Sequence, residues 1–390
     1  MKKIIKKALT ASIICCLVIT AAFQTSAYTL MEKGQKTAAT AKYFLSLDAP
    51  GTGSVGGEWM VLGLARCFAL SEDFRSSYYE TVVNHINETG SEKLDKNKST
   101  ENSRIIIALS SIGKDCTNIE GYNLIKPLSD FDFVTYQGLS GPVWALIALD
   151  TLNYKIVPDS TVKNQTTRAK LINYILEKQV PNGGWAFFGS ATDPDMTGMA
   201  IQALAKYYNI NDEVKTAVDK ALSALSKMQN DNGGFTSWGS ENSESCAQIV
   251  TALASLNRDS DLESDFIKNG NTLTDNLISF STENGFSHEV GGAYNQMATE
   301  QALYALMSYF RIKDSQTSLY DMSDLDVDMA PDDTNLDGSV NIMDASTIQR
   351  HLAKLITLSD LQFENADFDG DGRTTISDVT AVQKYLSGIH

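Results

Sequence analysis

The sequence predicts an all-α protein: six helical hairpins that close into an (α/α)6 toroid, then a small module of two loop–helix units. Three observations support this fold class. A short apolar segment of helical pattern that ends in a small residue plus Leu occurs six times between residues 28 and 311, at intervals of 40 to 55 residues. The segments around these pairs are apolar on all sides and alternate with amphipathic ones. Near the C-terminus, an acidic loop recurs 34 residues after its first copy.

Residues 1–27 have the pattern of an export signal. A basic head is followed by an apolar stretch from Ala8 to Phe23 and by the small residues Ser26 and Ala27. The apolar stretch is too short for a stable membrane span, and we predict a secretory signal peptide cleaved after Ala27. No later apolar run is long enough to cross a bilayer, so the mature protein is expected to be soluble, secreted and extracellular.

The composition limits the partners of this protein. The formal net charge is −16. Removal of the signal peptide would take away four lysines and no acidic residue, so the mature chain would be more negative still. Such a surface repels nucleic acid and anionic lipid, and it disfavours polyanions such as pectate unless calcium bridges them. The three cysteines of the mature chain, Cys67, Cys116 and Cys246, are too few for a disulfide framework. Nothing in the sequence selects a pair among them.

The six small-residue–Leu pairs predict the inner helices of the toroid domain, residues 28–311. They are Gly63-Leu64, Ala108-Leu109, Ala148-Leu149, Ala203-Leu204, Ala252-Leu253 and Ala305-Leu306. A helix that is apolar on every side is buried on every side. The amphipathic segments between them, such as Thr167–Lys178 and Asp212–Met228, predict outer helices that face water. Repeats of this length indicate a helical repeat architecture, with an open solenoid as the alternative to a closed ring.

A second repeat lies in the connecting loops. The run from Gln179 through Gly183-Gly184 to Trp185 is echoed by Gln229-Asn-Asp-Asn-Gly-Gly-Phe235, and more weakly by Asn284-Gly285-Phe286. It resembles the QW-type repeat of squalene–hopene cyclases and the related repeat of protein prenyltransferase β subunits, both α/α toroids. The resemblance implies that the Gln and the aromatic residue tie an outer helix to its loop. The Gly-Gly pair permits a turn with positive φ.

The N-terminal ends of the inner helices should gather at one mouth of the ring, and they supply the candidate catalytic residues Asp195, Asp193 and Glu58. Asp193-Pro-Asp195-Met196-Thr197 resembles the D-x-D-D-T motif with which class II terpene cyclases protonate an alkene, and Asp195 matches the acid of that motif. Met196 replaces the third Asp, which weakens the case for this chemistry. The alternative interpretation is that Asp195 caps its helix.

Three other motifs are incomplete. Glu244-Ser-Cys246 lies where prenyltransferases hold zinc, but the third ligand of that family, a His, is replaced by Ala298, and zinc needs three protein ligands. The segment from Gly53 to Met60 resembles a complement-type thioester loop without its Cys and Gln. A dinucleotide-type glycine spacing from Gly51 to Gly56 has no strand before it.

Carboxylates and tryptophans dominate the predicted ring mouth. Carboxylates with aromatic rings can bind sugars, because a pyranose face stacks on indole and its hydroxyls bond to carboxylates. Two carboxylates at a suitable distance would also permit glycoside hydrolysis. The set is Glu58, Glu101, Asp193, Asp195, Glu244 and Glu300 with Trp59, Trp144, Trp185 and Trp238.

Residues 312–331 are expected to be an extended, mobile acidic linker. They contain five aspartates and end at Pro331. The module that follows is expected over residues 332–390.

Two segments of this module match the calcium-loop template D-x-[DN]-x-[DN]-G. Oxygen donors fall at positions 1, 3, 5, 9 and 12, the backbone carbonyl of position 7 completes the set, and Gly stands at position 6. We therefore predict two Ca²⁺ ions. The ligand positions are Asp333, Asn335, Asp337, Ser339, Asn341 and Asp344 in the first loop and Asp367, Asp369, Asp371, Arg373, Thr375 and Asp378 in the second. Arg373 can serve only through its carbonyl.

Each loop is followed by a helix of matching pattern, and no good helix precedes the first loop. This tail resembles a type I dockerin, the calcium-folded module that plugs into a cohesin on a cellulosome scaffold. The resemblance implies a cohesin as partner. It also implies partner contacts from paired positions of the two copies, namely Ile342, Met343, Gln349 and Arg350 and, in the second, Ile376, Ser377, Gln383 and Lys384.

The sequence leaves two functions open. In the first, a secreted cellulosome-associated protein docks through its dockerin, and its toroid is an accessory module that binds a ligand such as a plant cell-wall polysaccharide, a lipid or a peptide. In the second, the toroid is an enzyme, either a polysaccharide hydrolase or lyase or a degenerate class II cyclase with Asp195 as acid. A dockerin tail usually accompanies cell-wall enzymes, but that is an association.

Overall fold

The computed structural model describes residues 27–67, 70–325, 333–337, 340–368 and 372–387. The predicted signal peptide therefore lies, except for Ala27, outside the described residues. The chain divides into two compact units. The first contains the described residues of Met1–Ala49, Ser54–Ala69 and Ile175–Leu319, and the second those of Pro50–Gly53, Leu70–Tyr174 and Tyr320–His390.

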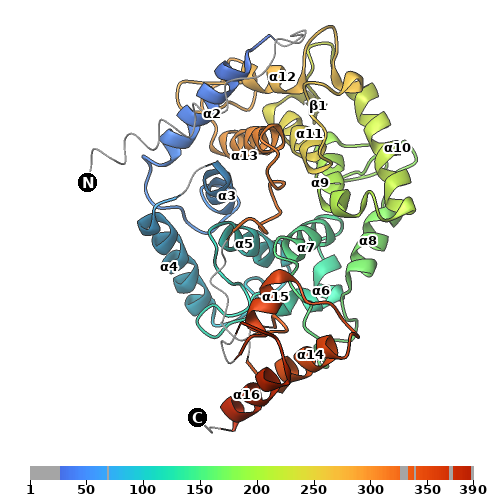
Figure 1. Ribbon diagram of the computed structural model, residues 1–390. Coiled ribbons are helices and arrows are strands. Elements are labelled where there is room, and N and C mark those ends of the chain that lie inside the picture. Colours follow the sequence, from blue (N-terminus) through green and yellow to red (C-terminus); the bar gives the residue numbers. More distant parts are fainter. Residues whose placement is uncertain (1–26, 68–69, 326–332, 338–339, 369–371, 388–390) are drawn as a thin grey trace. The chain divides into compact units, whose positions relative to one another are not determined.

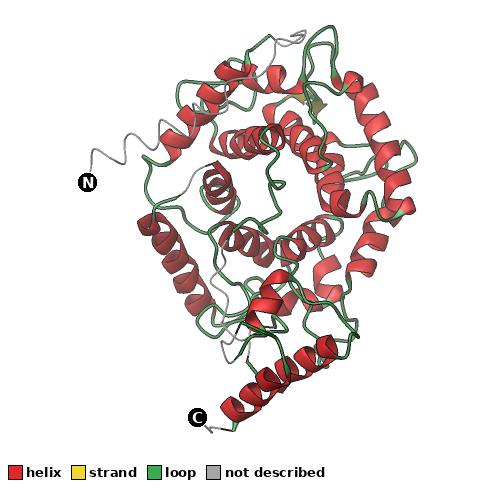
Figure 2. Ribbon diagram, in the orientation of Figure 1, coloured by secondary structure: helices red, strands yellow, loops and turns green. Residues whose placement is uncertain are grey.

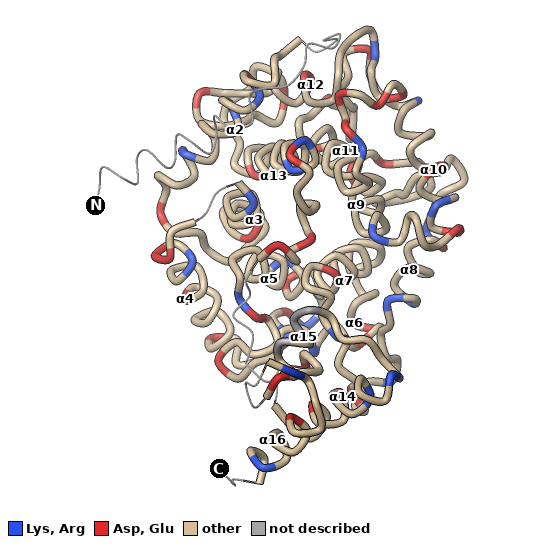
Figure 3. The backbone as a smooth tube through the Cα atoms, in the orientation of Figure 1, with Lys and Arg blue, Asp and Glu red and all other residues tan. Residues whose placement is uncertain are grey.

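The described residues are almost entirely helical or in loops, as the predicted fold class requires (Figure 2). Their one sheet is a two-residue antiparallel hairpin, β1 (Thr236–Ser237) with β2 (Ser240–Glu241). Acidic positions recur along the tube of both units (Figure 3), in line with 48 Asp and Glu against 32 Lys and Arg. No helix in the described part of the chain is long and apolar enough to span a membrane.

All six helices predicted as inner ones form, and each contains its small-residue–Leu pair. They are α3 (Glu58–Cys67), α5 (Ser99–Ser111), α7 (Ser140–Asp150), α9 (Pro194–Leu204), α11 (Ser243–Ser255) and α13 (Gln296–Lys313). In the first unit, α11 packs between α9 and α13, and α3 packs on α13 (Figure 1). In the second unit, α5 packs on α7. Small side chains allow this close approach: a Cβ on Gly63 would meet Leu303 of α13 at 3.0 Å.

The helices between them are amphipathic or short. They are α2 (Leu30–Phe44), α4 (Glu72–Thr89), α6 (Phe131–Thr135), α8 (Arg168–Glu177), α10 (Asp212–Met228) and α12 (Leu273–Ser279), with 3₁₀ turns η1 (Lys126–Ser129), η2 (Ala205–Tyr207) and η3 (Ser264–Phe266). Helix α10 buries Val214, Val218 and Leu225 against the inner layer and begins at the cap residue Asn211. The predicted outer segments at 167–178 and 212–228 are thus confirmed, the first to within one residue at each end.

The QW-type repeat ties helices to loops as expected. The Gln179 amide donates to the carbonyls of Gly183 and Ala217, both at 2.7 Å, and the Gln229 amide donates to those of Gly233 and Phe266 at 2.8 and 2.9 Å. The Trp185 ring is fully buried, and its Nε1 donates to the Ile175 carbonyl at 2.6 Å. These contacts give the repeat a structural role, because they satisfy buried polar groups between an outer helix and the next loop.

The expectation of an extended, mobile linker is wrong for its described part. Helix α13 continues to Lys313, and Leu319 and Met322 are buried. In the first unit, Arg66 and Arg311 donate to the Thr317 hydroxyl at 2.9 and 2.7 Å. In the second unit, the Met322 amide donates to the Thr151 carbonyl at 3.0 Å. The scattered apolar residues anchor this segment although aspartates dominate its composition. Residues 326–331 lie outside the described residues.

In its described residues, the C-terminal module has three helices: α14 (Ile342–Leu352), α15 (Asp360–Asn365) and α16 (Ile376–Leu386). Helix α14 packs on α16. Its buried core is small and consists of Ala345, Ile348, Leu358, Ala366, Val379 and Val382. As predicted, each acidic loop leads into a helix, and the two helices start with the same capping box, Asn341 with Asp344 and Thr375 with Asp378.

Candidate functional site

In the first acidic loop, buried carboxylates join the beginning of the loop to its end. Asp333, Asn335 and Asp344 are at most 2% exposed. The Asp344 carboxylate accepts hydrogen bonds from the amides of Asn335 at 2.9 Å and Asn341 at 2.8 Å, and burial raises its pKa. The side-chain oxygen and nitrogen of Asn335 are both buried without a hydrogen-bond partner. A buried amide oxygen among carboxylates suits a calcium ion, which binds six to eight oxygens.

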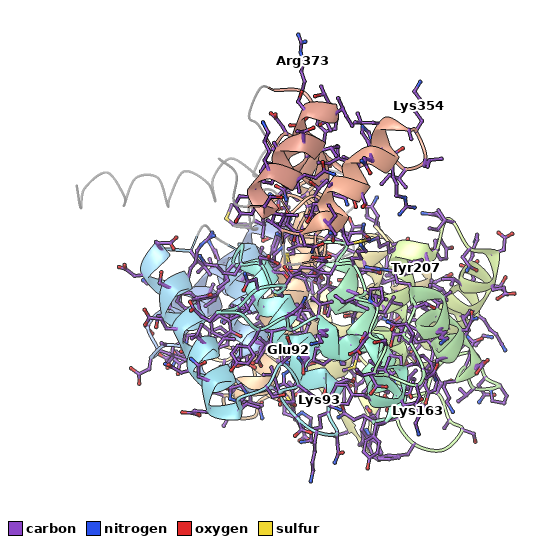
Figure 4. All side chains as sticks on the ribbon, turned by 90° about the horizontal axis from the view of Figure 1, so that it is seen from below. Glu92, Lys93, Lys163, Tyr207, Lys354 and Arg373 are labelled. Atoms are coloured by element: carbon purple, nitrogen blue, oxygen red, sulfur yellow. The ribbon has the colours of Figure 1, made fainter. Side chains whose placement is uncertain are left out.

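The second loop follows the same plan. The Asp378 carboxylate is buried and accepts from the Thr375 amide at 2.6 Å. Asp367 accepts from the Gly372 amide at 2.8 Å through one oxygen, and its other oxygen is buried without a partner. Gly372 has φ +81°, which is the sharp turn that position 6 requires. The Arg373 side chain is exposed and extends away from the module (Figure 4), so only its carbonyl can face the loop.

The predicted ligand set is only partly described. Ser339, Asp369 and Asp371 lie outside the described residues. Within the described residues, no three or more Asp, Glu, His or Cys side chains are gathered so as to hold a metal. The described members still fit calcium, because the loops offer buried oxygens that backbone amides do not fully satisfy.

The predicted partner-contact positions are exposed in both copies. Ile342 and Met343 are 53% and 51% exposed, and Ile376 is 63% exposed. Ser377 and the paired positions Gln349, Arg350, Gln383 and Lys384 are also exposed. Large apolar side chains at the start of two related helices are unusual on a solvated surface and are typical of an interaction site.

In the first unit, Asp193 and Asp195 have different roles. The helix cap of α9 is Asp193, whose carboxylate accepts from the Met196 amide at 2.8 Å. The alternative that Asp195 caps the helix is therefore wrong. Pro194 occupies the first helical position and makes the residue before it the cap. Asp195 lies in the first turn, and its Oδ1 is buried without a hydrogen-bond partner. Burial, together with the charges of Asp193 and Glu244, raises its pKa to about 6.

Two further carboxylates from neighbouring inner helices are buried in a similar way. Glu244, the second residue of α11, is 6% exposed; its Oε2 lies 2.9 Å from His288 Nδ1, and its Oε1 has no partner. Glu300 of α13 is fully buried and accepts from the Gly56 amide and the Gln296 side chain, both at 2.7 Å. Its Oε2 has no partner. Burial raises the pKa of Glu300 to about 7, and the Glu58 charge adds to this effect.

We call Asp195, Glu244 and Glu300 the helix-start cluster. The charges of all three act on the Tyr304 hydroxyl, whose pKa is raised first by burial and then by these neighbours. The Gln248 amide donates to that hydroxyl at 2.6 Å. Glu58, also fully buried, begins α3 beside Glu300. The fold of the first unit thus brings together five of the six predicted mouth carboxylates.

The remaining predicted residues are placed differently. Glu101 belongs to the second unit and accepts a bidentate salt bridge from the Arg104 guanidinium, at 2.9 and 2.7 Å. Trp144 is also in the second unit. Cys246 is buried, and its thiol donates to the Leu273 carbonyl at 3.1 Å, so it is a core thiol. His288 was not predicted, because it lies 44 residues from Glu244 in a loop with no motif around it.

The cluster is suited to hydrogen bonding and to proton donation at ordinary strength. A carboxyl group with a raised pKa holds its proton more firmly than a free one, which is the opposite of what alkene protonation requires. A protonated carboxyl next to an ionised one can act as a general acid in hydrolysis. It can also donate and accept hydrogen bonds with a neutral polar ligand.

These features define an all-α repeat protein with a buried acidic cluster and a C-terminal module of two acidic loop–helix units. A family model described as the prenyltransferase alpha-alpha toroid domain matches residues 126–320, half of the chain, and the dockerin type I domain model matches residues 331–387. The chain belongs to the prenyltransferase α/α toroid family and has a type I dockerin at its C-terminus. A search of curated proteins found no match.

The dockerin match has three consequences. Type I dockerins bind calcium, which agrees with the two acidic loops. A dockerin implies a cohesin partner. Proteins with this domain are typically extracellular components of cellulosomes.

Proposed function

We propose that this protein is a secreted cellulosome component, whose dockerin docks on a scaffold cohesin and whose toroid is an accessory module that binds a ligand during plant polysaccharide breakdown. The toroid domain would extend over residues 28–311. The mature chain would begin at Tyr28.

In the dockerin, the loop residues would hold two Ca²⁺ ions, one between Asp333 and Asp344 and one between Asp367 and Asp378. Calcium supplies positive charge, which offsets the repulsion between the carboxylates of each loop. The chain's own contacts already tie the Asp344 carboxylate to both ends of its loop. They orient the start of α14, and the hydrogen bond from the Thr375 amide to Asp378 does the same for α16; Ile342 and Ile376 are exposed at these helix starts.

The observation that carries the ligand-binding role is the helix-start cluster. Each of its three carboxylates has one buried oxygen with no hydrogen-bond partner, and none pairs with a Lys or Arg of the described residues. A buried unsatisfied polar atom costs about 1–3 kcal/mol, so three in one cluster are expensive for stability alone. Such groups are retained where a ligand completes their hydrogen bonds.

The second candidate function is enzymatic cleavage of a polysaccharide, as a hydrolase or as a lyase. Asp195 favours it, because a carboxyl with a pKa of about 6 beside Asp193 and Glu244 is suited to general acid catalysis near neutral pH. The degenerate cyclase has less support, since the same shift makes Asp195 a weaker acid.

Two measurements on the full mature chain test these roles. Titration with Ca²⁺ should show uptake of two ions and calcium-dependent binding to a cohesin, both weakened in Asp344→Ala and Asp378→Ala. Incubation with a panel of plant polysaccharides should show binding without new products, and Asp195→Asn and Glu58→Gln should weaken that binding. Products formed by the wild type and lost in Asp195→Asn would establish the enzyme instead.

A further inference from the structure

Three large aromatic side chains are exposed together in the first unit. Phe187, Phe188 and Trp238 are 52%, 73% and 76% exposed. The two phenylalanine rings meet at a centroid distance of 4.5 Å and an angle of 85°, and Phe188 meets Trp238 at 6.4 Å and 82°. We call these residues the aromatic triad. An exposed apolar surface of this kind costs solubility and usually marks a binding site.

The backbone conformation of Trp238 is also energetically unfavourable. Trp238 and Gly239 form the turn of the β1–β2 hairpin, with φ +54° and +94°. A two-residue turn with both φ values positive is type I′, which favours Asn, Asp or Gly at its first position. A residue with a Cβ loses about 1–2 kcal/mol in this left-handed region. Trp238 is therefore unfavourable both for the left-handed backbone conformation of the turn and for an exposed surface position. Such departures are typical of functional residues.

The elements that present the triad are firmly anchored. Glu241 of β2 accepts from the side chains of Asn232 and Asn276, both at 2.8 Å, which fixes the hairpin to the body of the unit. The loop that contains the two phenylalanines is closed at its base, where the Asp193 amide donates to the Trp185 carbonyl at 2.8 Å. The backbone segments that carry the rings are therefore anchored before any ligand arrives, which lowers the entropic cost of binding.

Asp193 links the triad to the helix-start cluster. Its carboxylate accepts from the Ser237 hydroxyl at 3.3 Å, next to Trp238, and it is two residues from Asp195. Its charge contributes to the raised pKa of Asp195. Exposed rings and hydrogen-bonding carboxylates therefore belong to one continuous part of the first unit.

We propose that the aromatic triad is a stacking subsite for neutral pyranose residues of a polysaccharide chain, next to carboxylates that accept the sugar hydroxyls. The proposal rests on the ligand-binding role of the toroid and names its ligand class. A pyranose offers an apolar C–H face to an aromatic ring and hydroxyl donors at its rim, which matches rings beside Asp193 and Ser237.

Other ligand classes fit the triad less well. A quaternary ammonium needs several ring faces around one point. Here neighbouring rings meet edge to face, at centroid distances of 4.5 and 6.4 Å, so their faces do not surround one point. A polyanion would be repelled by the acidic chain.

Tryptophan fluorescence gives a direct test, because all four tryptophans of the sequence are described and Trp238 is the only exposed one; the others are at most 9% exposed. The calcium-loaded full chain, freed of excess calcium, would be titrated with soluble xylan, mixed-linkage β-glucan, galactomannan, polygalacturonate and choline, with acrylamide as quencher. We expect a neutral polysaccharide to protect Trp238 from quenching. Polygalacturonate and choline should give no protection.

Three variants separate binding from folding. Trp238→Asn places a favoured residue in the type I′ turn, so the hairpin should be kept while affinity falls about tenfold or more. Because this variant lacks the fluorescent reporter, the affinities of all variants would be measured by isothermal titration calorimetry. Phe188→Ala should weaken binding less. Tyr136→Ala removes an aromatic residue directly after α6 in the second unit that is 68% exposed, and it should leave affinity unchanged.

The outcomes distinguish the two proposals. If the wild type binds a neutral polysaccharide and Trp238→Asn binds it equally well, the triad is not the subsite, although the toroid still binds this ligand. If quenching protection appears only with choline or polygalacturonate, the ligand class is wrong. If no probe binds the wild type, both the subsite and the polysaccharide-binding role are overturned, while cohesin binding is unaffected by that result.

Discussion

Two groups of buried acids in the first unit are built in opposite ways. In the Lys33 cluster, made of Lys33, Asp261 and Asp275, the Lys33 ammonium is 1% exposed and lies 2.8 Å from Asp261 and 3.0 Å from Asp275. In the helix-start cluster, Asp195, Glu244 and Glu300 have no Lys or Arg partner among the described residues, and each keeps an unpartnered oxygen.

The difference separates stability from function. A buried carboxylate with its own cation and donors is satisfied by the fold and has nothing to offer a ligand. A buried carboxylate without them is destabilised until something else supplies a proton, a donor or a charge. The dockerin loops are a third case, in which the cation is calcium from solution.

The largest expected effect comes from removing the protein's own cation. Lys33→Met leaves the buried Asp275 and the largely buried Asp261 without their cation, so the free energy of unfolding should fall by about 3–5 kcal/mol. Chemical denaturation followed by circular dichroism in excess calcium would measure this. Lys42→Met, an exposed position of the same helix, is the control and should change little. A loss below about 1 kcal/mol would show that the fold does not depend on this pairing.

Removing the external cation should have the next largest effect. The dockerin core is small, so its helices should depend on calcium for stability. One ion at a hundred times its Kd contributes about 2.7 kcal/mol. A chelator should therefore speed amide exchange in α14 and α16 roughly a hundredfold, and leave α9, α11 and α13 as they are. Equal protection with and without chelator would contradict the calcium-dependent fold.

How well the sequence predicted these regions depended on how local each signal is. The inner helices were found because residues such as Ala252-Leu253 lie in segments apolar on every side, and this signature needs no tertiary contact. The acidic loops were found because their donor spacing is fixed within twelve residues. The cap assignment failed although Pro194 gave a local signal for Asp193 as the cap.

Other features had no local signal. The pairing of Glu244 with His288 joins residues 44 positions apart, and only the packed fold brings them together. Trp238 was seen as one of four tryptophans, but nothing in the sequence distinguishes an exposed Trp in a type I′ turn, since that turn normally has Asn or Gly there. Leu319 and Met322 were hidden by the aspartates around them.

The comparison also predicts a pH dependence of moderate size. The folded pKa values of Asp195, about 6, and Glu300, about 7, lie above their ordinary values of 3.8 and 4.5. The folded state therefore binds these protons more tightly than the unfolded one. The stability this provides is complete below about pH 4 and is lost as the pH rises through 6 to 7.

The size of this effect is on the order of 1–2 kcal/mol for each group once partial solvent screening of Asp195 is allowed for. It would be measured as the difference in unfolding free energy between wild type and Asp195→Asn or Glu300→Gln, at pH 5 and pH 8 in excess calcium. In the neutral variants, the unfolding free energy should fall less between pH 5 and pH 8 than it does in the wild type. A variant whose decline matches that of the wild type would show that its carboxylate does not titrate in this window.

The smallest expected effect separates the two roles of Asp193. Asn caps helices as well as Asp does, so Asp193→Asn should change the unfolding free energy by less than about 0.5 kcal/mol, whereas Asp193→Ala should cost about 1 kcal/mol. The Asp193 charge contributes to the raised pKa of Asp195, so Asp193→Asn should lower that pKa. The decline in stability should then begin at a lower pH, which carboxyl NMR titration of Asp195 would measure directly. An unchanged Asp195 pKa would mean that burial and the Glu244 charge set it without Asp193, and that the helix-start cluster is electrostatically independent of the residue that links it to the aromatic triad.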